Sequence, residues 1–292
     1  MSASSRDADA DVATPLEEAA ALADLVARAR TGDGASLDEL VSRIQGPIYG
    51  LSLRMLWHPE DARDATQDIL IRVITGLAGF RGESTFLTWV YRVGANYLLS
   101  TRRSRLEEKR MTFEAFARDL DTGLSDAPPA VEAPAEDILL LEEVKVGCTL
   151  GMLSCLDRPH RLAYILGEIL ELDGPEAAGI LEIDAPTYRK RLSRARKDIV
   201  AFMRAKCGLV APGRPCRCRR RVRRAIELGR VDPRQLRFVS DADRARRFAP
   251  VLAEIRRLTE TRRAAALYRS HADPVAPEDF ALRIRQRLAL HT

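Results

Sequence analysis

The stretch DGPEAAGILEIDAPTYRKRLSRARK, residues 173–197, decides the fold expected for this chain. Its first half predicts a short helix over residues 174–181, followed by a turn at Glu182 and Ile183. Asp184 is a favourable N-cap, and Pro186 is tolerated in a first helical turn, so a second helix is expected to begin here. Because this second helix is rich in arginine and lysine, the pair is typical of a helix-turn-helix, whose second helix enters the DNA major groove. The alternative is a basic surface helix.

Helical periodicity continues on both sides of this stretch. Leu37, Leu40 and Ile44 recur at the spacing of one helix face, and a similar pattern runs from about residue 138 to 206. Strand signals are scarce, and aromatic residues make up only 5% of the chain, which favours packed helices. We therefore expect an all-α protein of two helical domains. The expected parts are a disordered N-terminus (1–15), a helical domain (16–106), an acidic linker (107–137), a helix-turn-helix domain (138–206) and a helical, basic C-terminal extension rich in cysteine and arginine (207–292).

The net charge of +5 hides an uneven distribution. Residues 217–292 hold 20 arginines, no lysine and nine acidic residues, a balance of +11, so the rest of the chain carries −6. Residues 107–143 contain 11 acidic and three basic residues, a balance of −8. Segments charged so differently are expected to have separate electrostatic tasks. We expect the basic extension to fold, to modulate activity and to place its arginines beside either the acidic linker or upstream DNA.

Several classes of protein are excluded by what the sequence lacks. No apolar run approaches the ~20 residues of a membrane span, and the acidic first residues lack the apolar core of a secretory signal. Five cysteines in 292 residues suit a reducing cytoplasm. No phosphate-binding loop, HExxH, G-x-S-x-G or dinucleotide-binding motif occurs. We therefore expect a cytoplasmic protein that is not an enzyme, needs no cofactor and has no membrane partner.

Residues 61–73, DARDATQDILIRV, predict a helix with two different faces. Its alanines, Ile69 and Val73 fall on one narrow apolar face, and Asp61, Asp64 and Asp68 form a stripe beside it. Stacked like charges destabilise a helix, so the stripe does not serve helix formation as such. Two interpretations follow, a solvated face near the helix N-terminus or a docking surface for a basic partner.

Residues 80–96, FRGESTFLTWVYRVGAN, combine aromatic and basic side chains. A loop is expected to enter a helix at Ser84 or Thr85. The aromatic residues of that helix, Phe86, Trp89 and Tyr91, have arginines as neighbours. Aromatic faces stack on unpaired bases while arginine neutralises phosphate, a chemistry common in single-strand binding. The alternative is that these aromatic side chains belong to the core.

Three segments, in this order and separation, resemble a bacterial RNA polymerase sigma factor of the extracytoplasmic-function type. They are PEDARDATQDILIRV, FRGESTFLTWVYRVGAN and GPEAAGILEIDAPTYRKRLSRAR, and the resemblance covers roughly residues 22–203. It implies a protein that binds core RNA polymerase, recognises promoter DNA and helps to open the duplex for transcription initiation. An anti-sigma protein is a further partner that the resemblance implies. The sequence departs from the family in one place, since Asn96 is followed four residues later by Ser100 where aspartate is common.

The resemblance implies three groups of site residues and no catalytic one. The expected polymerase-binding residues are Asp61, Asp64, Gln67 and Asp68. The expected contacts to downstream, melted promoter DNA are Arg81, Phe86, Trp89, Tyr91, Arg92, Asn96 and Arg103. The expected contacts to upstream, double-stranded promoter DNA are Thr187, Arg189, Lys190, Arg191, Ser193, Arg194 and Arg196. Two other classes of protein stay open. One is a stand-alone helix-turn-helix regulator, which has no use for the polymerase-binding residues or for the contacts to melted DNA. The other is a protein-interaction module.

Cys207, Cys216 and Cys218 form a C-x8-C-x-C pattern beside several arginines. Neighbouring guanidinium groups predict a lowered thiol pKa and a reactive thiolate. The pattern permits a redox switch, a metal site or inert thiols, and inert thiols without a metal are the state we expect. A structural zinc ion takes four protein ligands, so a fourth would have to come from a distant group such as His160 or His271.

Overall fold

The computed structural model describes residues 15–101, 111–126, 134–239, 248–271, 276 and 280–289. Within these ranges the regular elements are helices, and the extended pairings are two isolated bridges. The expected all-α class is confirmed. No helix in the described part of the chain combines the length and the apolar character needed to cross a membrane. The N-terminal stretch predicted to be disordered lies, apart from Pro15, outside the described residues.

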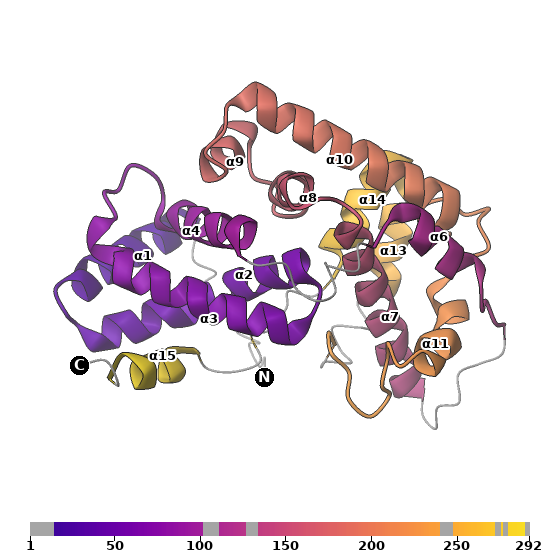
Figure 1. The fold of residues 1–292 in the computed structure, drawn as a ribbon, viewed down its shortest axis with the longest axis horizontal. Helices are drawn as coiled ribbons and strands as arrows, with labels where there is room; N and C mark the ends of the chain where they lie inside the picture. The colour runs from indigo at the N-terminus through magenta and orange to yellow at the C-terminus, as the bar shows by residue number, and fades with distance from the viewer. Residues whose placement is uncertain are drawn as a thin grey trace, which may run out of the picture.

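The N-terminal bundle lies at the left of Figure 1. It consists of α1 (Pro15–Arg30), α2 (Gly34–Leu56), α3 (Pro59–Gly76), the 3-10 helix η1 (Leu77–Gly79) and α4 (Phe86–Ser100). Leu40 and Ile44 of α2 are each 1% exposed, as the predicted apolar periodicity requires. Asp33 and Thr85 cap α2 and α4 by accepting hydrogen bonds from backbone N–H groups. The predicted start of the second of these helices is therefore confirmed.

The predicted helix-turn-helix is present in the second half of the chain. The elements there are α7 (Pro134–Ser154), α8 (Arg158–Tyr164), the π-helical turn η2 (Ile165–Ile169), α9 (Gly174–Ile180) and α10 (Ala185–Lys206). Asp173 and Asp184 cap α9 and α10, each accepting a backbone hydrogen bond of 2.7 Å. Glu182, in the turn between them, has a left-handed φ of 53°. The caps and this turn fix the angle at which α10 leaves α9.

A packed helix, α6 (Phe113–Asp121), lies within the acidic linker expected over residues 107–137. Thr112 caps it, and Phe116 and Leu120 are 5% and 4% exposed. Phe116 stacks on Phe202 of α10, with ring centroids 5.6 Å apart. The acid-rich composition of this segment conceals an apolar face at helical spacing, formed by Phe116 and Leu120. Residues 107–110 and 127–133 lie outside the described residues.

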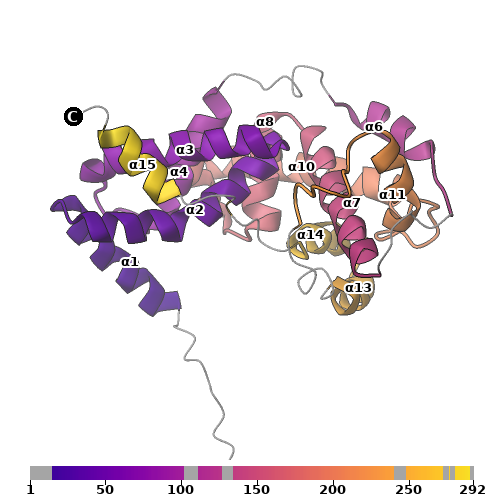
Figure 2. The same ribbon diagram turned by 90° about the horizontal axis from the view of Figure 1, so that it is seen from below.

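The C-terminal extension folds, as expected, into helices. They are α11 (Cys218–Glu227), α13 (Phe248–Arg257), α14 (Glu260–Arg269) and α15 (Phe280–Ala289). Helix α11 packs on α7 and α14 packs on α10, whereas α15 lies apart from them, against α2 and α3 of the N-terminal bundle (Figures 1 and 2). Arg221 and Arg230 pair with Asp119 at 3.0 and 2.6 Å, and Arg220 pairs with Asp126 at 2.7 Å. These arginines therefore lie beside the acidic segment, one of the two neighbours expected for them.

Glu143 of α7 joins the extension to the helix-turn-helix half. It is 1% exposed, and its carboxylate accepts the backbone N–H groups of Arg237, Phe238 and Val239 at 2.8, 2.9 and 3.1 Å. Burial raises the pKa of Glu143, and the three donors oppose that shift. A buried carboxylate needs hydrogen-bond donors, and the backbone of residues 237–239 supplies them to Glu143.

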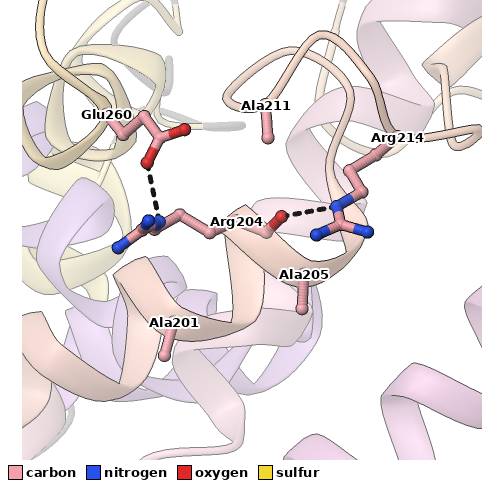
Figure 3. A pocket seen from close by; sticks show the side chains of 6 residues that line it. All are labelled: Ala201, Arg204, Ala205, Ala211, Arg214 and Glu260. Atoms are coloured by element: carbon pink, nitrogen blue, oxygen red, sulfur yellow. Dashed lines mark hydrogen bonds and ion pairs between the residues drawn. The ribbon is translucent and has the colours of Figure 1, made fainter.

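A shallow hollow of about 340 Å³ lies where α10, the turn after it and α14 meet (Figure 3). Its lining residues are Ala201, Arg204, Ala205, Ala211, Arg214 and Glu260. Glu260 pairs with Arg204 at 2.6 Å, and Arg214 Nε donates to the Arg204 carbonyl oxygen at 2.9 Å. The one carboxylate among these lining residues, that of Glu260, is already paired with the Arg204 guanidinium group. The lining residues therefore provide no set of groups for acid–base or nucleophilic catalysis.

Candidate nucleic-acid interface

The first turns of α10 present polar and basic side chains to solvent. Arg189, Lys190, Ser193 and Arg194 are exposed, while Tyr188 on the other face is 2% exposed and anchors the helix in the core. A row of cationic side chains at the beginning of the second helix is the arrangement that reaches base edges and phosphates in the major groove. The sequence-predicted upstream contacts are therefore brought together, on one helix and at its exposed end.

Three other residues of that predicted group are less available. The Thr187 hydroxyl donates to the Asp184 carboxylate at 3.0 Å, and its backbone N–H donates there as well. Both bonds hold the pKa of Asp184 below its usual value. Arg196 Nε donates to Glu168 at 2.9 Å, and Arg191 is half-buried. Thr187 and Arg196 thus stabilise the helix-turn-helix itself, and a DNA contact from either would replace a bond inside the protein.

The aromatic side chains of residues 80–96 form a packed cluster beside α3. Phe80, Phe86 and Trp89 lie with ring centroids 5.4 to 5.7 Å apart. Phe86 is 5% exposed and Tyr91 is 7% exposed, whereas Trp89 is half-buried. In this arrangement Phe86 and Tyr91 are core residues, which is the alternative that the sequence left open. Base stacking by these two rings stays a prediction that requires them to become exposed.

The arginines expected to contact melted DNA differ in position. Arg81 lies in the loop before α4, with a side chain 83% exposed. Arg92 is half-buried on α4. Arg103 lies outside the described residues. Among the described residues of this group, Arg81 is the arginine most open to a phosphate.

Helix α4 contacts α9 and the turn after it. Asn96 Nδ2 donates to Glu182 Oε2 at 3.0 Å, and the Thr88 hydroxyl donates to Glu176 Oε1 at 2.6 Å. Arg158 of α8 adds two hydrogen bonds to backbone carbonyls at the end of α4 and just beyond it, at 2.9 and 2.6 Å. Asn96 thus has a protein partner in this arrangement, although its side chain is exposed. The two glutamates were not singled out by sequence analysis, because nothing local marks a contact made between distant helices.

The predicted acidic stripe lies along α3, and its members are exposed to different degrees. Asp64 is exposed and Asp61 is half-buried, whereas Gln67 is 8% exposed. Asp68 accepts a hydrogen bond of 2.8 Å from the Tyr97 hydroxyl of α4. Burial and this contact raise the pKa of Tyr97. Asp61 and Asp64 are therefore the most available acidic groups of the stripe, while Asp68 also holds α3 to α4.

All five cysteines are free thiols, and burial dominates their chemistry. Burial raises the pKa of Cys216 to about 11 and the pKa of Cys155 to about 12. It also raises the pKa of Cys148, Cys207 and Cys218. The expectation of lowered thiol pKa values is wrong, because desolvation outweighs the neighbouring guanidinium groups. The thiols of the uncomplexed protein are therefore protonated and poorly reactive at neutral pH.

Neither histidine considered as a fourth metal ligand is placed for that role. His160 Nδ1 lies 2.6 Å from the Asp157 carboxylate, and His271 Nε2 lies 3.3 Å from the Thr149 hydroxyl. Each ring thus uses one nitrogen for another partner. Within the described ranges, no three side chains of histidine, cysteine, aspartate or glutamate are already arranged to hold a metal ion.

Comparisons with known proteins show what this chain is similar to. Residues 40–107, which span most of α2 and all of α3 and α4, match the family described as Sigma-70 region 2. The ECF RNA polymerase sigma-E factor of Haemophilus influenzae is 31% identical over 60% of this chain and 91% of its own length. The RNA polymerase sigma-H factor of Pseudomonas aeruginosa is 31% identical over 60% of this chain and 90% of its own. Among solved structures, CnrH in complex with the cytosolic domain of CnrY shares 22% identity at a TM-score of 0.43, covering 62% of this chain and 96% of CnrH.

The all-α fold, the exposed basic helix-turn-helix and the match to Sigma-70 region 2 together define, as a class, a transcription initiation factor. Because it covers about nine tenths of relatives that are 31% identical, the chain belongs to the extracytoplasmic-function type of RNA polymerase sigma factors. It binds core RNA polymerase and recognises promoter DNA for transcription initiation, and the family is a non-enzymatic class. The family predicted from the three motifs is confirmed, and a stand-alone regulator is not favoured.

Proposed function

We propose that α3 docks this sigma factor on core RNA polymerase, that α10 reads the upstream promoter element, and that residues 80–96 help to open the duplex. The observation that carries the proposal is the exposed row of Arg189, Lys190, Ser193 and Arg194, which begins one turn after the Asp184 cap. The N-terminal half of a recognition helix is the part that meets base edges. The protein acts in the cytoplasm, beside its polymerase, and catalyses no reaction itself.

Strand opening requires the compact arrangement to change. Helix α4 has to separate from α9, because Asn96 is bonded to Glu182 and Thr88 to Glu176. A base taken out of the duplex then needs stacking and hydrogen-bonding partners that offset an unpairing cost of a few kcal/mol. Trp89 is half-buried, whereas Phe86 and Tyr91 are buried. Of these three aromatic side chains, Trp89 therefore needs the least rearrangement to reach solvent.

The test is transcription in vitro by the full chain with core polymerase, on fragments of the source genome. A sigma factor produces discrete transcripts that core polymerase alone does not make, and permanganate detects a melted bubble at their start sites. A stand-alone helix-turn-helix regulator instead binds some fragments and yields no transcript. Binding without transcription, with polymerase known to be active, rules out the proposal.

Alanine substitution of Arg189, Lys190 or Arg194 should separate base reading from phosphate binding. A residue that contacts a base edge is expected to lose ~1–3 kcal/mol of discrimination at one base pair. A residue that contacts phosphate should weaken binding on every sequence and lower the salt dependence of binding. The measurement is the affinity of each variant for promoter fragments changed one base pair at a time.

The matched control for these variants is Lys197→Ala, an exposed cation on the same helix but two turns beyond Arg189. It should leave base preference unchanged. If the three test variants all weaken binding equally on every fragment, none of them reads bases, and the assignment of α10 as the reading helix is contradicted.

A further inference from the structure

The chain crosses twice between its N-terminal bundle and its helix-turn-helix half. It passes first from α4 to α6, which packs on α10 through the stacked rings of Phe116 and Phe202. It returns near the C-terminus, from α14 on the helix-turn-helix half to α15 on the N-terminal bundle (Figures 1 and 2). Two separate stretches of chain therefore join the halves, and the second belongs to the extension.

Helix α14 is fixed to the helix-turn-helix half by apolar and polar contacts. Tyr268 is buried, and its ring packs edge-on against Tyr164 of α8, with centroids 5.6 Å apart. Arg269 donates to the Glu168 carbonyl oxygen at 2.8 Å and pairs with Glu171 at 3.1 Å. These contacts hold α14 to α8, to η2 and to the turn before α9, in addition to its packing on α10.

Helix α15 is seated on the other half, against α2 and α3. Phe280 is 0% exposed and Ile284 is 2% exposed, so an apolar face fills the seat. The Phe280 N–H donates to Gln45 Oε1 at 3.1 Å, and Arg285 pairs with Asp38 at 3.1 Å. Gln45 and Asp38 both belong to α2, so these polar contacts fix the position of α15 along that helix.

The connection between α14 and α15 limits how far the two halves can separate. Residues 272–279 join the two helices, and eight residues reach at most roughly 30 Å at ~3.3–3.6 Å per residue. While both helices are seated, the seat of α15 stays within this distance of the end of α14. A second tether also raises the effective concentration at which the halves meet, because their contact forms within one chain.

The polar contacts between α4 and α9 are weak by themselves. Asn96 and Glu182 share a hydrogen bond, and both side chains are exposed. The bond from the Thr88 hydroxyl to Glu176 is only partly buried. Water competes for exposed donors and acceptors, so such bonds contribute little net stability. The buried apolar face of α15 supplies a firmer link between the halves, because burial of large apolar side chains strongly favours the seated state.

We propose that the C-terminal extension is an intramolecular clamp, which holds α4 against α9 as long as α15 is seated on α2 and α3. Release of α15 removes the second tether, and the closed arrangement then depends on the α4–α9 bonds and on the contacts of α7 and α8 with α2. The clamp acts on strand opening through residues 80–96, and in this respect it rests on the proposed function. The apparent affinity for melted promoter DNA is the intrinsic affinity reduced by the fraction of chains with the clamp open.

Energy transfer between two dyes measures the separation of the halves in the full chain. The dyes are attached through non-natural amino acids that replace Asp24 of α1 and Lys197 of α10, both exposed. Phe280→Asp combined with Ile284→Asp should release α15 and lower the transfer. The ratio of open to closed chains should rise more than about tenfold, because opening no longer has to expose two buried apolar side chains, each worth about that factor.

Leu282→Asp is the matched control, since Leu282 lies on the same helix and is 50% exposed. It should leave the energy transfer unchanged. Circular dichroism checks the fold of the double variant, and Arg285→Asp avoids any buried change. Arg285→Asp should open the clamp by a smaller factor, about two- to fivefold, because it removes a surface ion pair. Adding Asp38→Arg should close the clamp again, since the ion pair then forms with its charges exchanged.

The outcomes separate the clamp from a helix that only stabilises the N-terminal bundle. A lower free energy of unfolding with unchanged energy transfer in the double variant overturns the clamp. Equal changes in energy transfer for the double variant and Leu282→Asp overturn it as well. Transcription in vitro tests the proposed function separately, because a wild-type chain that yields no transcript with active polymerase contradicts that function alone. If the double variant opens but melts no more promoter DNA than the wild type, the role of the clamp in strand opening is overturned.

Discussion

Replacing Asp61 and Asp64 with lysine is expected to abolish binding to core RNA polymerase while leaving the fold intact. Both carboxylates lie on α3, Asp64 exposed and Asp61 half-buried. A basic partner surface that attracts them would repel two lysines, and like charges brought together across an interface cost several kcal/mol. Asp68 is left unchanged in this variant, because it accepts the Tyr97 hydroxyl hydrogen bond that holds α3 to α4.

The measurement is co-elution of the variant with core polymerase, together with its helical circular dichroism signal. The control reverses two exposed acidic residues elsewhere, Asp24→Lys with Glu254→Lys, and should bind as the wild type does. Surface pairs such as Asp24 with Arg28 contribute little to stability, so the control should also fold. Undiminished co-elution of the Asp61 and Asp64 variant would show that the stripe is only a solvated face.

Arg161→Leu should lower the free energy of unfolding by about 3–5 kcal/mol, because it removes the donors of three buried carbonyl oxygens. Arg161 of α8 is 3% exposed. Its guanidinium donates to the carbonyl oxygens of Ser154 at 3.1 Å and Leu156 at 2.9 Å, and to that of Met55 at the end of α2. Leucine fills part of the space but leaves these buried acceptors without donors, at ~1–3 kcal/mol each.

Urea unfolding followed by circular dichroism measures this loss. Arg189→Ala, which removes an exposed arginine, is the control and should change stability by no more than about 0.5 kcal/mol. A loss below about 1 kcal/mol for Arg161→Leu would mean that water reaches these carbonyl groups, and that the link between α2 and α8 is weaker than its contacts indicate.

The parts of the fold that local chemistry determines could be predicted from the sequence. Asp184 and Pro186 mark the start of α10 because capping depends on residues within one turn. The same is true of Thr85 at the start of α4. The exposed cations of α10 followed from helical periodicity once the core-facing Tyr188 was placed.

What the sequence did not reveal depends on contacts between distant segments. The pairing of Asn96 with Glu182 spans 86 residues, and no local pattern announces it. The thiol pKa values were predicted in the wrong direction because neighbouring charges are visible in a sequence, whereas desolvation depends on the final packing.

The hydrogen bonds to Glu143 also set an order of events during protein synthesis. The first of its donors, the Arg237 N–H, lies 94 residues later in the chain, which corresponds to roughly 5–20 s of translation at ~5–20 residues per second. A nascent chain that has released α7 but not residues 237–239 has to keep Glu143 hydrated or protonated. The helix-turn-helix half therefore reaches its final packing only late in translation, and a premature stop codon before residue 239 would yield a protein with α7 incompletely packed.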